Sequence, residues 1–216
     1  YGEGATDLSR RLWIDIGQAS MDELLGDYRS AIPYWHKAAQ DQDWSGSQGT
    51  AISGEASDEA LDHDPAAARI ALSQSETSGN SDLIEADIDW GYFALPNYFI
   101  DRARGDWQAA RADAASADRA LTKPRGGLDH TSLFGRNAWV WPWLALAEAK
   151  TGDPKAAHAL IDRTPGDCYL CLRVRGMIDA TQQRWSSADY WFARAVQRAP
   201  LLPFAYSEWG EMLLRE

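Results

Sequence analysis

One six-residue pattern occurs five times in this chain of 216 residues, and no other feature limits its fold as strongly. Each copy ends with a small residue followed by Ala, which we call the closing Ala. The copies are residues 26–31, 63–68, 105–110, 152–157 and 183–188. Gly or another turn residue can end one helix in the left-handed conformation, and the Asp that usually follows can cap the next helix, whose first turn tolerates Pro. The pattern therefore predicts five helix–turn–helix joints.

Residues on both sides of each joint repeat as well. Four and seven residues after each closing Ala, the chain has Trp35 and Ala38, Leu72 and Ser75, Ala114 and Ala117, Ile161 and Thr164, and Phe192 and Ala195. This spacing is one face of an amphipathic helix. Twelve residues before the closing Ala, small residues stand in four copies, namely Ala19, Ala56, Ala145 and Gly176, with Tyr98 in the other. Small residues at both places predict two antiparallel helices in close contact, with a bulky residue beside them.

This arrangement resembles the tetratricopeptide repeat (TPR) family, which has a period of about 34 residues. In the best copy, residues 169–202, the family's signature slots hold Leu172, Gly176, Trp185, Ala188, Phe192, Ala195 and Pro200. Residues 138–168 come second, with Trp141, Leu144, Ala145, Gly152, Ala157 and Pro165. The resemblance implies an all-α, right-handed α-solenoid of about five degenerate TPR-like helical hairpins plus a C-terminal helix.

The expected organisation is a single domain over residues 1–216 that belongs to a longer protein. The repeats are expected at about 12–45, 49–82, 91–124, 138–168 and 169–202, and the C-terminal helix at 203–216. The first three copies carry extra residues rich in Gly, Ser, Gln, Asp and Thr, at 40–50, 73–82 and 122–137. Because turn residues are abundant there, we predict enlarged loops between hairpins.

Charge is unevenly distributed along the chain. Residues 1–100 contain 18 Asp and Glu against 5 Lys and Arg, a net charge of -13, whereas residues 101–216 contain 14 against 16, or +2. A total of -11 argues against nucleic acid as a partner, because Lys and Arg supply most of that affinity. The asymmetry predicts a protein or peptide partner with basic patches that meets the first 100 residues.

No run of 18 or more apolar residues occurs, so no membrane span is expected. The sequence shows no signal peptide, which favours the cytoplasm but leaves a secreted or periplasmic mature chain open. The only two cysteines form a CxxC motif, Cys168 and Cys171. A redox pair or half of a zinc site are the functional alternatives, and two partly buried structural thiols are the favoured interpretation.

Catalytic motifs are missing from the sequence. No two of His36, His63, His130 and His158 lie within four residues of each other, and HExxH, P-loop and GxSxG motifs are absent. The acidic clusters lack the spacing of an EF-hand and read as solvated helix faces. We therefore predict a protein that is not an enzyme and that needs no metal or cofactor.

Eleven Trp residues are the other unusual feature, and most fall at packing positions of the repeat. Trp139, Trp141 and Trp143 alternate around Pro142, and residues two apart do not share a helix face, so at least one should be exposed. The TPR resemblance implies a concave groove lined by the first helix of each pair. The predicted groove residues are Trp13, Tyr92, Leu95, Phe99, Trp139, Trp143, Arg173 and Met177.

The preferred functional prediction is a non-catalytic TPR scaffold that binds a protein or peptide through this aromatic, apolar groove. The alternative is a small-ligand or glycan-binding module that uses the Trp-rich surface around Trp139, Trp141 and Trp143. Self-association through an open end of the solenoid is a close variant of the first. The Lys, Arg and Asn clamp by which one TPR subfamily holds a partner's C-terminal carboxylate is not expected, because the corresponding positions are mostly apolar.

Overall fold

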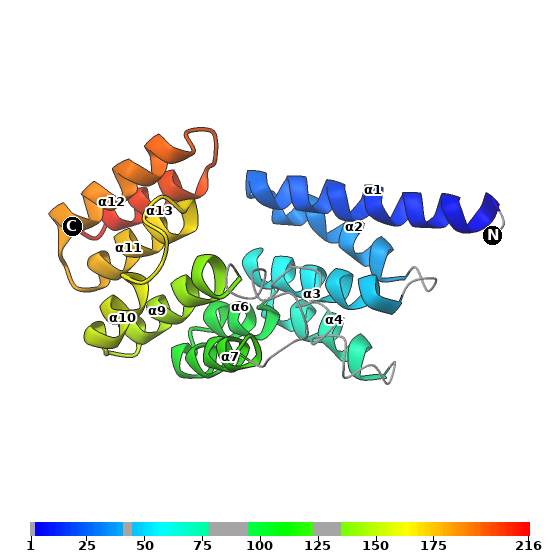
Figure 1. The fold of residues 1–216 in the computed structure, drawn as a ribbon, viewed down its shortest axis with the longest axis horizontal. Coiled ribbons are helices and arrows are strands. Elements are labelled where there is room, and N and C mark those ends of the chain that lie inside the picture. Colours follow the sequence, from blue (N-terminus) through cyan, green and yellow to red (C-terminus); the bar gives the residue numbers. More distant parts are fainter. Residues whose placement is uncertain (1–2, 41–44, 78–94, 123–134) are drawn as a thin grey trace. The chain divides into compact units, whose positions relative to one another are not determined.

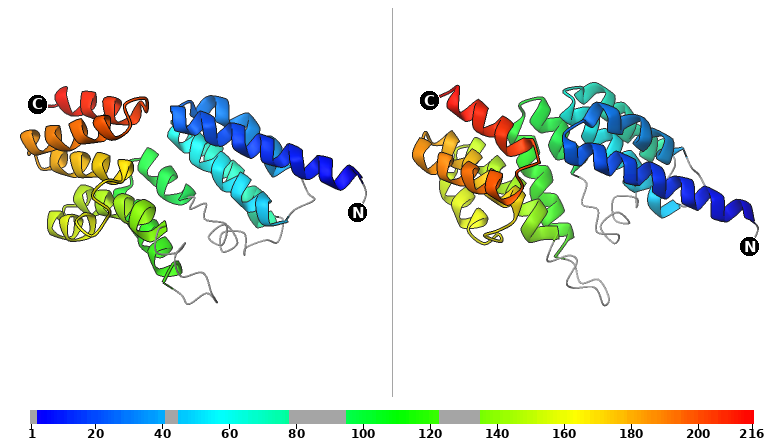
Figure 2. Two further views of the ribbon diagram at one scale, coloured as in Figure 1. Left: turned by 45° about the horizontal axis from the view of Figure 1, so that its top comes forward. Right: turned by 90° about the horizontal axis from the view of Figure 1, so that it is seen from above.

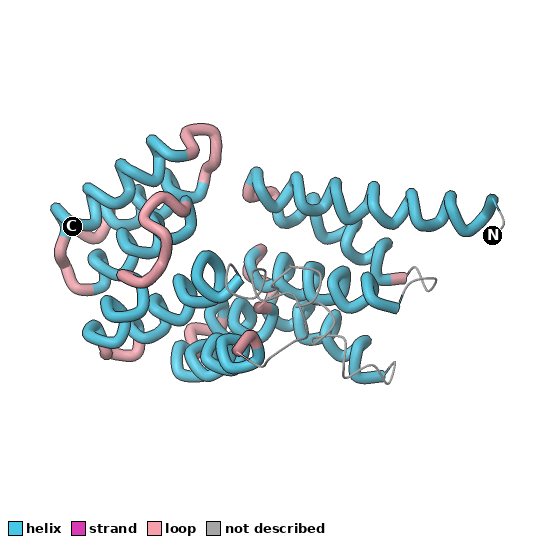
Figure 3. Tube along the Cα trace, in the orientation of Figure 1, coloured by secondary structure: helices cyan, strands magenta, loops and turns pink. Residues whose placement is uncertain are grey.

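The computed structural model describes residues 3–40, 45–77, 95–122 and 135–216, and these residues form helices and no strand (Figure 1 and Figure 3). The prediction of an all-α fold is confirmed. The chain forms two compact units, residues 1–106 and 107–216. The boundary falls at the third predicted joint, so each unit is described separately.

The first unit contains α1 (Glu3–Leu25), α2 (Tyr28–Ala39), α3 (Ser45–Leu61), α4 (Pro65–Thr77) and α6 (Pro96–Ala103). The second contains α7 (Trp107–Ala120), a π-helical turn η1 (Arg136–Val140), α9 (Trp141–Lys150), α10 (Pro154–Ile161), α11 (Tyr169–Thr181), α12 (Trp185–Arg198) and α13 (Phe204–Leu213). Helices pack on their neighbours in sequence: α1 on α2, α2 on α3 and α3 on α4 in the first unit, and α9 on α10 and α11 on α12 in the second. Figure 2 shows α11, α12 and α13 side by side.

All five predicted joints are present, and they share one backbone geometry. The first residue of each copy, which we call the joint residue, has a positive φ: Gly26 75°, His63 69°, Gly105 75°, Gly152 93° and Gln183 56°. At each joint, the next residue's N–H donates to the carbonyl five residues back, as from Asp27 to Asp22 (2.9 Å) and from Arg184 to Asp179 (3.0 Å). This is the Schellman motif, which satisfies the last carbonyls of a helix.

The second helix of each pair begins as the pattern predicts. The side chains of Asp27, Asp64 and Asp153 accept hydrogen bonds from backbone N–H groups at the starts of α2, α4 and α10. Pro65 and Pro154 are the first residues of α4 and α10, where a missing N–H costs no helical hydrogen bond.

The closing Ala residues Ala31, Ala68, Ala110, Ala157 and Ala188 are all fully buried. Large side chains pack beside these Ala residues, and two first helices have a glycine where such a side chain contacts the backbone. A Cβ added at Gly176 in α11 would lie 2.9 Å from the ring of Phe192 in α12, and one at Gly54 in α3 would lie 2.6 Å from the ring of Trp35 in α2. Both rings have no exposed surface, so close helix contact depends on these two glycines.

The loop predictions for residues 40–50, 73–82 and 122–137 are wrong in part. Helix α3 already begins at Ser45, α4 continues to Thr77, and Arg136 and Asn137 belong to η1. Residues 49–58 of α3 are all buried, so packing on neighbouring helices outweighs the weak helix propensity of its Gly, Ser and Thr. The predicted C-terminal helix is confirmed as α13, whereas the right-handed solenoid arrangement of the hairpins stays a prediction.

Replacing Gly176 with Ala should lower the free energy of unfolding by about 1–3 kcal/mol, because the added methyl group overpacks the Phe192 ring. The matched control is Gly210→Ala in α13, where a Cβ meets no atom within 4 Å. That variant should be neutral or stabilising through its better helix propensity. Urea unfolding followed by circular dichroism measures both. Equal stability changes in the two variants would contradict the proposed close contact.

Candidate functional site

The eight predicted groove residues differ widely in their exposure. Trp13 and Trp139 are exposed, and Met177 is partly buried. Leu95, Phe99, Trp143 and Arg173 are buried, so a partner could reach them only after neighbouring groups moved. Tyr92 lies outside the described residues. Since Trp13 belongs to the first unit and Trp139 to the second, each is considered within its own unit.

Trp139 is 37% exposed and is the only one of the three alternating tryptophans that presents its ring to solvent. Its ring packs edge-on against buried Trp143, with centroids 6.5 Å apart. Trp141 is also buried, and its indole N–H donates to Asp118 over 2.6 Å. Pro142 cannot donate a backbone hydrogen bond, and the Trp141 N–H reaches back five residues to the carbonyl of Arg136. Trp139 lies within this wider π-helical turn.

Arg173 holds α13 against α11. Its Nε donates to Glu208 over 2.8 Å and its Nη2 donates to the second oxygen of the same carboxylate. The guanidinium also lies over the rings of Phe204, at 4.6 Å, and Tyr169, at 5.3 Å. This bidentate, stacked arrangement occupies the side chain fully. The structural role of Arg173 therefore explains its position better than partner binding does.

Acid–base contacts connect successive hairpins at equivalent positions of the repeat. The acidic partner stands four residues before a joint residue, and the basic partner directly follows the closing Ala of the preceding copy. Arg69 pairs with Asp101 (3.2 Å) and Arg111 with Glu148 (3.3 Å), while His158 Nε2 lies 3.7 Å from Asp179, beyond hydrogen-bond distance. These contacts were not predicted from the sequence, although a carboxylate occupies this position in every copy: Asp22, Glu59, Asp101, Glu148 and Asp179.

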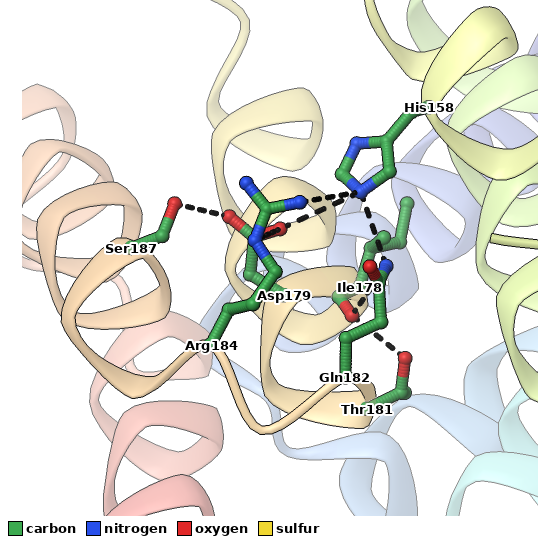
Figure 4. Close-up of polar contacts among 7 residues, drawn as sticks. All are labelled: His158, Ile178, Asp179, Thr181, Gln182, Arg184 and Ser187. Atoms are coloured by element: carbon green, nitrogen blue, oxygen red, sulfur yellow. Dashed lines mark hydrogen bonds and ion pairs between the residues drawn. The ribbon is translucent and has the colours of Figure 1, made fainter. Parts of the chain in front are cut away.

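The third of these contacts belongs to a polar cluster that contains Ser, His and Asp (Figure 4). The carboxylate of Asp179 is central: the Ser187 hydroxyl donates to it, and Arg184 lies 3.6 Å away. Arg184 Nη1 and Gln182 Nε2 both lie within 3.2 Å of His158 Nε2. Because arginine can only donate, that imidazole nitrogen is an acceptor. A nucleophilic serine would need its hydroxyl on the imidazole, so this cluster does not form a catalytic triad.

A second buried cluster lies where α1, α2 and α3 meet. The Trp35 indole N–H is 3.0 Å from Glu23 Oε1 and 3.0 Å from Asp58 Oδ2. Asp58 also has a side-chain hydrogen bond with Glu23 and is only 1% exposed. Burial, followed by the nearby negative charge of Glu23, raises the pKa of Asp58 to about 9. Buried Asp58 therefore keeps its proton at neutral pH, beside the partly buried carboxylate of Glu23.

The predicted free thiols of Cys168 and Cys171 are wrong, because the two residues form a disulfide. Cys168 is the N-cap of α11 and Cys171 lies in its first turn, which brings their Cα atoms to 5.1 Å, within the range that a disulfide spans. Among the described residues, no group of three or more His, Cys, Asp or Glu side chains could hold a metal ion. No helix in the described ranges has the length and apolar character that crossing a membrane requires.

No family model, no curated protein and no solved structure matches this chain. The resemblance to TPR proteins consequently depends on the residues and joints described above.

Replacing Asp58 with Asn should stabilise the protein at alkaline pH. Folded Asp58 keeps a proton that the unfolded residue releases near its ordinary pKa of 3.8, so wild-type stability declines as pH rises from about 4 towards about 9. Asn accepts from Trp35 and donates to Glu23 without a titrating proton, which flattens this dependence. We expect a gain of about 1–3 kcal/mol near the alkaline end and none near pH 4.

The control is Asp62→Asn, which removes only a surface ion pair with Arg29. Thermal unfolding across the pH range compares the three proteins. A parallel pH dependence in wild type and Asp58→Asn would contradict the raised pKa of Asp58.

Proposed function

We propose that this chain is a non-catalytic helical-repeat scaffold of the TPR type that binds protein or peptide segments with basic side chains. The observation that carries the proposal is an acidic surface at the joint between α3 and α4, which consists of Glu59, Asp62 and Asp64. We call it the acidic joint. Each of these carboxylates is at least partly exposed.

The carboxylates of the acidic joint repel one another, and this repulsion contributes to the raised pKa of Glu59. Burial raises the pKa of Glu59, and the nearby charges of Asp64, Glu55 and Asp62 raise it further. Arg29 of α2 contacts Asp62 at 3.0 Å, but its side chain is mostly in solvent. A Lys or Arg from a partner would relieve this repulsion, so a basic segment is favoured there over an acidic or neutral one.

Two further features of the first unit also favour a basic partner. The first 100 residues carry 18 acidic and 5 basic residues, a net charge of -13, which attracts a cationic segment from a distance. The exposed Trp13 ring of the same unit supplies an aromatic surface of the kind that anchors peptides. Complementary charge sets the rate of encounter and the selectivity, and aromatic contacts add affinity.

The Cys168–Cys171 disulfide bears on the compartment. Disulfides persist in oxidising compartments and are rare in the cytosol. We therefore favour a secreted or periplasmic location over the cytoplasmic one that the sequence suggested.

Charge reversal tests the acidic joint. The triple variant Glu59→Lys, Asp62→Lys and Asp64→Lys should bind fluorescein-labelled oligolysine at least tenfold more weakly than wild type, with a smaller dependence on salt. Fluorescence anisotropy at low and at physiological ionic strength measures both quantities. Asp58 is left unchanged because it is buried, and circular dichroism checks that α4 stays folded once Asp64 no longer caps it.

The matched control reverses three exposed carboxylates of the second unit, Asp162, Asp167 and Glu211, and changes the net charge equally. Its effect on oligolysine binding should be small. If both triple variants weakened binding to the same extent, only net charge would matter and the acidic joint would not be the binding surface.

The alternative function, glycan or small-ligand binding around Trp139, is supported by the exposed ring of that residue alone, since Trp141 and Trp143 are buried. It predicts that oligosaccharides change the Trp fluorescence of the wild type and that Trp139→Ala abolishes the change. An unchanged fluorescence spectrum of the wild type at millimolar oligosaccharide would remove this alternative.

A further inference from the structure

Helix α1 is apolar on two opposite faces. One face carries Leu12 and Ala19, which are buried in a core with α2, and Ile16, which packs against them. The opposite face carries Ile14, Met21, Leu24 and Leu25, and each of these four side chains is more than half exposed. We call the four residues and Gly17, which lies among them, the outer face of α1. Contiguous exposed apolar side chains of this kind usually mark a surface that another protein element covers.

Later first helices show what normally covers such a face. Helix α3 packs against both α2 and α4, and its residues 49–58 are buried without interruption. Helix α11 packs against α12 on one side and α9 and α10 on the other, and its residues 170–176 are likewise all buried. Helix α1 packs on α2 and leaves its outer face exposed. Continuity of this packing predicts that another helix covers the outer face.

We propose that a second copy of this chain covers it, with the two α1 helices packed antiparallel about a two-fold axis. In the register that places Gly17 opposite Met21 of the other copy, Ile14 lies opposite Leu24. Gly17 leaves open space, since a Cβ there would meet no atom within 4 Å, and the flexible Met21 side chain can fill it. The outer face is thus complementary to itself, as a two-fold interface must be.

The charges on and near the outer face also favour antiparallel pairing of the two α1 helices. None of the five residues of the outer face carries a charge, so their direct contact brings no like charges together. The antiparallel register also brings the end of α1 that bears exposed Arg11 next to the end that precedes exposed Asp27 of the other copy. A parallel pairing would instead place like charges together at each end. Opposite charges at both ends therefore favour the antiparallel arrangement.

The contact is one helix wide, less than the roughly 1,600 Å² of a standard interface, so a dimer with micromolar Kd is expected. It goes beyond the proposed peptide binding and does not depend on it. The acidic joint belongs to α3 and α4, so loss of one property leaves the other measurable.

Sedimentation velocity over a concentration series tests the proposal. Wild type should pass from monomer to dimer as concentration rises, and Met21→Glu should weaken the dimer at least tenfold. The matched control is Ile70→Glu on α4, which adds the same charge at a side chain that is also more than half exposed. It should dimerise like wild type. Circular dichroism confirms that each variant is folded.

Register is tested by cross-linking a mixture of two single variants, Gly17→Cys and Met21→Cys. Disulfide-linked heterodimers should exceed the homodimers of either variant. The proposal is overturned if the wild type stays monomeric at the highest concentration, or if Met21→Glu dimerises unchanged. It is also overturned if assembly continues beyond the dimer or if homodimers prevail in the mixture.

Discussion

The structure depends on the close contact of two antiparallel helices at residues that have almost no side chain. A buried closing Ala in each second helix, and Gly176 in α11, leave room between the two backbones for rings such as that of Phe192. Such a contact forms only if the turn reverses the chain at a defined residue. The left-handed joint residue and the Schellman hydrogen bonds meet that requirement five times, twice without glycine, at His63 and Gln183.

Polar residues add a second set of constraints where hairpins meet. Arg69 with Asp101 and Arg111 with Glu148 connect a second helix to the next first helix, and Arg173 with Glu208 connects α11 to α13. Polar groups with such partners avoid the cost of burial without a hydrogen bond, and Asp58 avoids the cost of a buried charge by keeping its proton. These groups are therefore explained by packing between helices. The outer face of α1 has no such explanation, and the acidic joint keeps an excess of negative charge although Asp64 caps α4 and Asp62 binds Arg29.

Sequence alone predicted the parts of the fold that depend on local chemistry. Joint residues, Asp caps, closing Ala residues and α13 follow from short-range patterns, and all are present. It failed where residues distant in sequence determine the structure. The helix α3 is stabilised by the burial of its residues 49–58 between α2 and α4, and Arg173 is held by Glu208, 35 residues later. The same holds for the candidate site: of the predicted groove residues that the structure describes, only Trp13 and Trp139 are exposed. The carboxylate before each joint residue could have been found from the sequence, because it has a fixed place in the repeat.

The contact between Trp35 and Gly54 limits how the order of the hairpins could be changed. The five joints are built alike, which suggests modules that could be exchanged or duplicated by recombination. Yet Trp35 of one hairpin needs a glycine in the next, and among the first helices only α3 offers one against that ring. The contacts between successive hairpins differ as well: one places Arg69 beside Asp101, and another places His158 beside Asp179. Each hairpin is therefore matched to its own neighbour, and a shuffled chain would keep its turns but lose its interfaces.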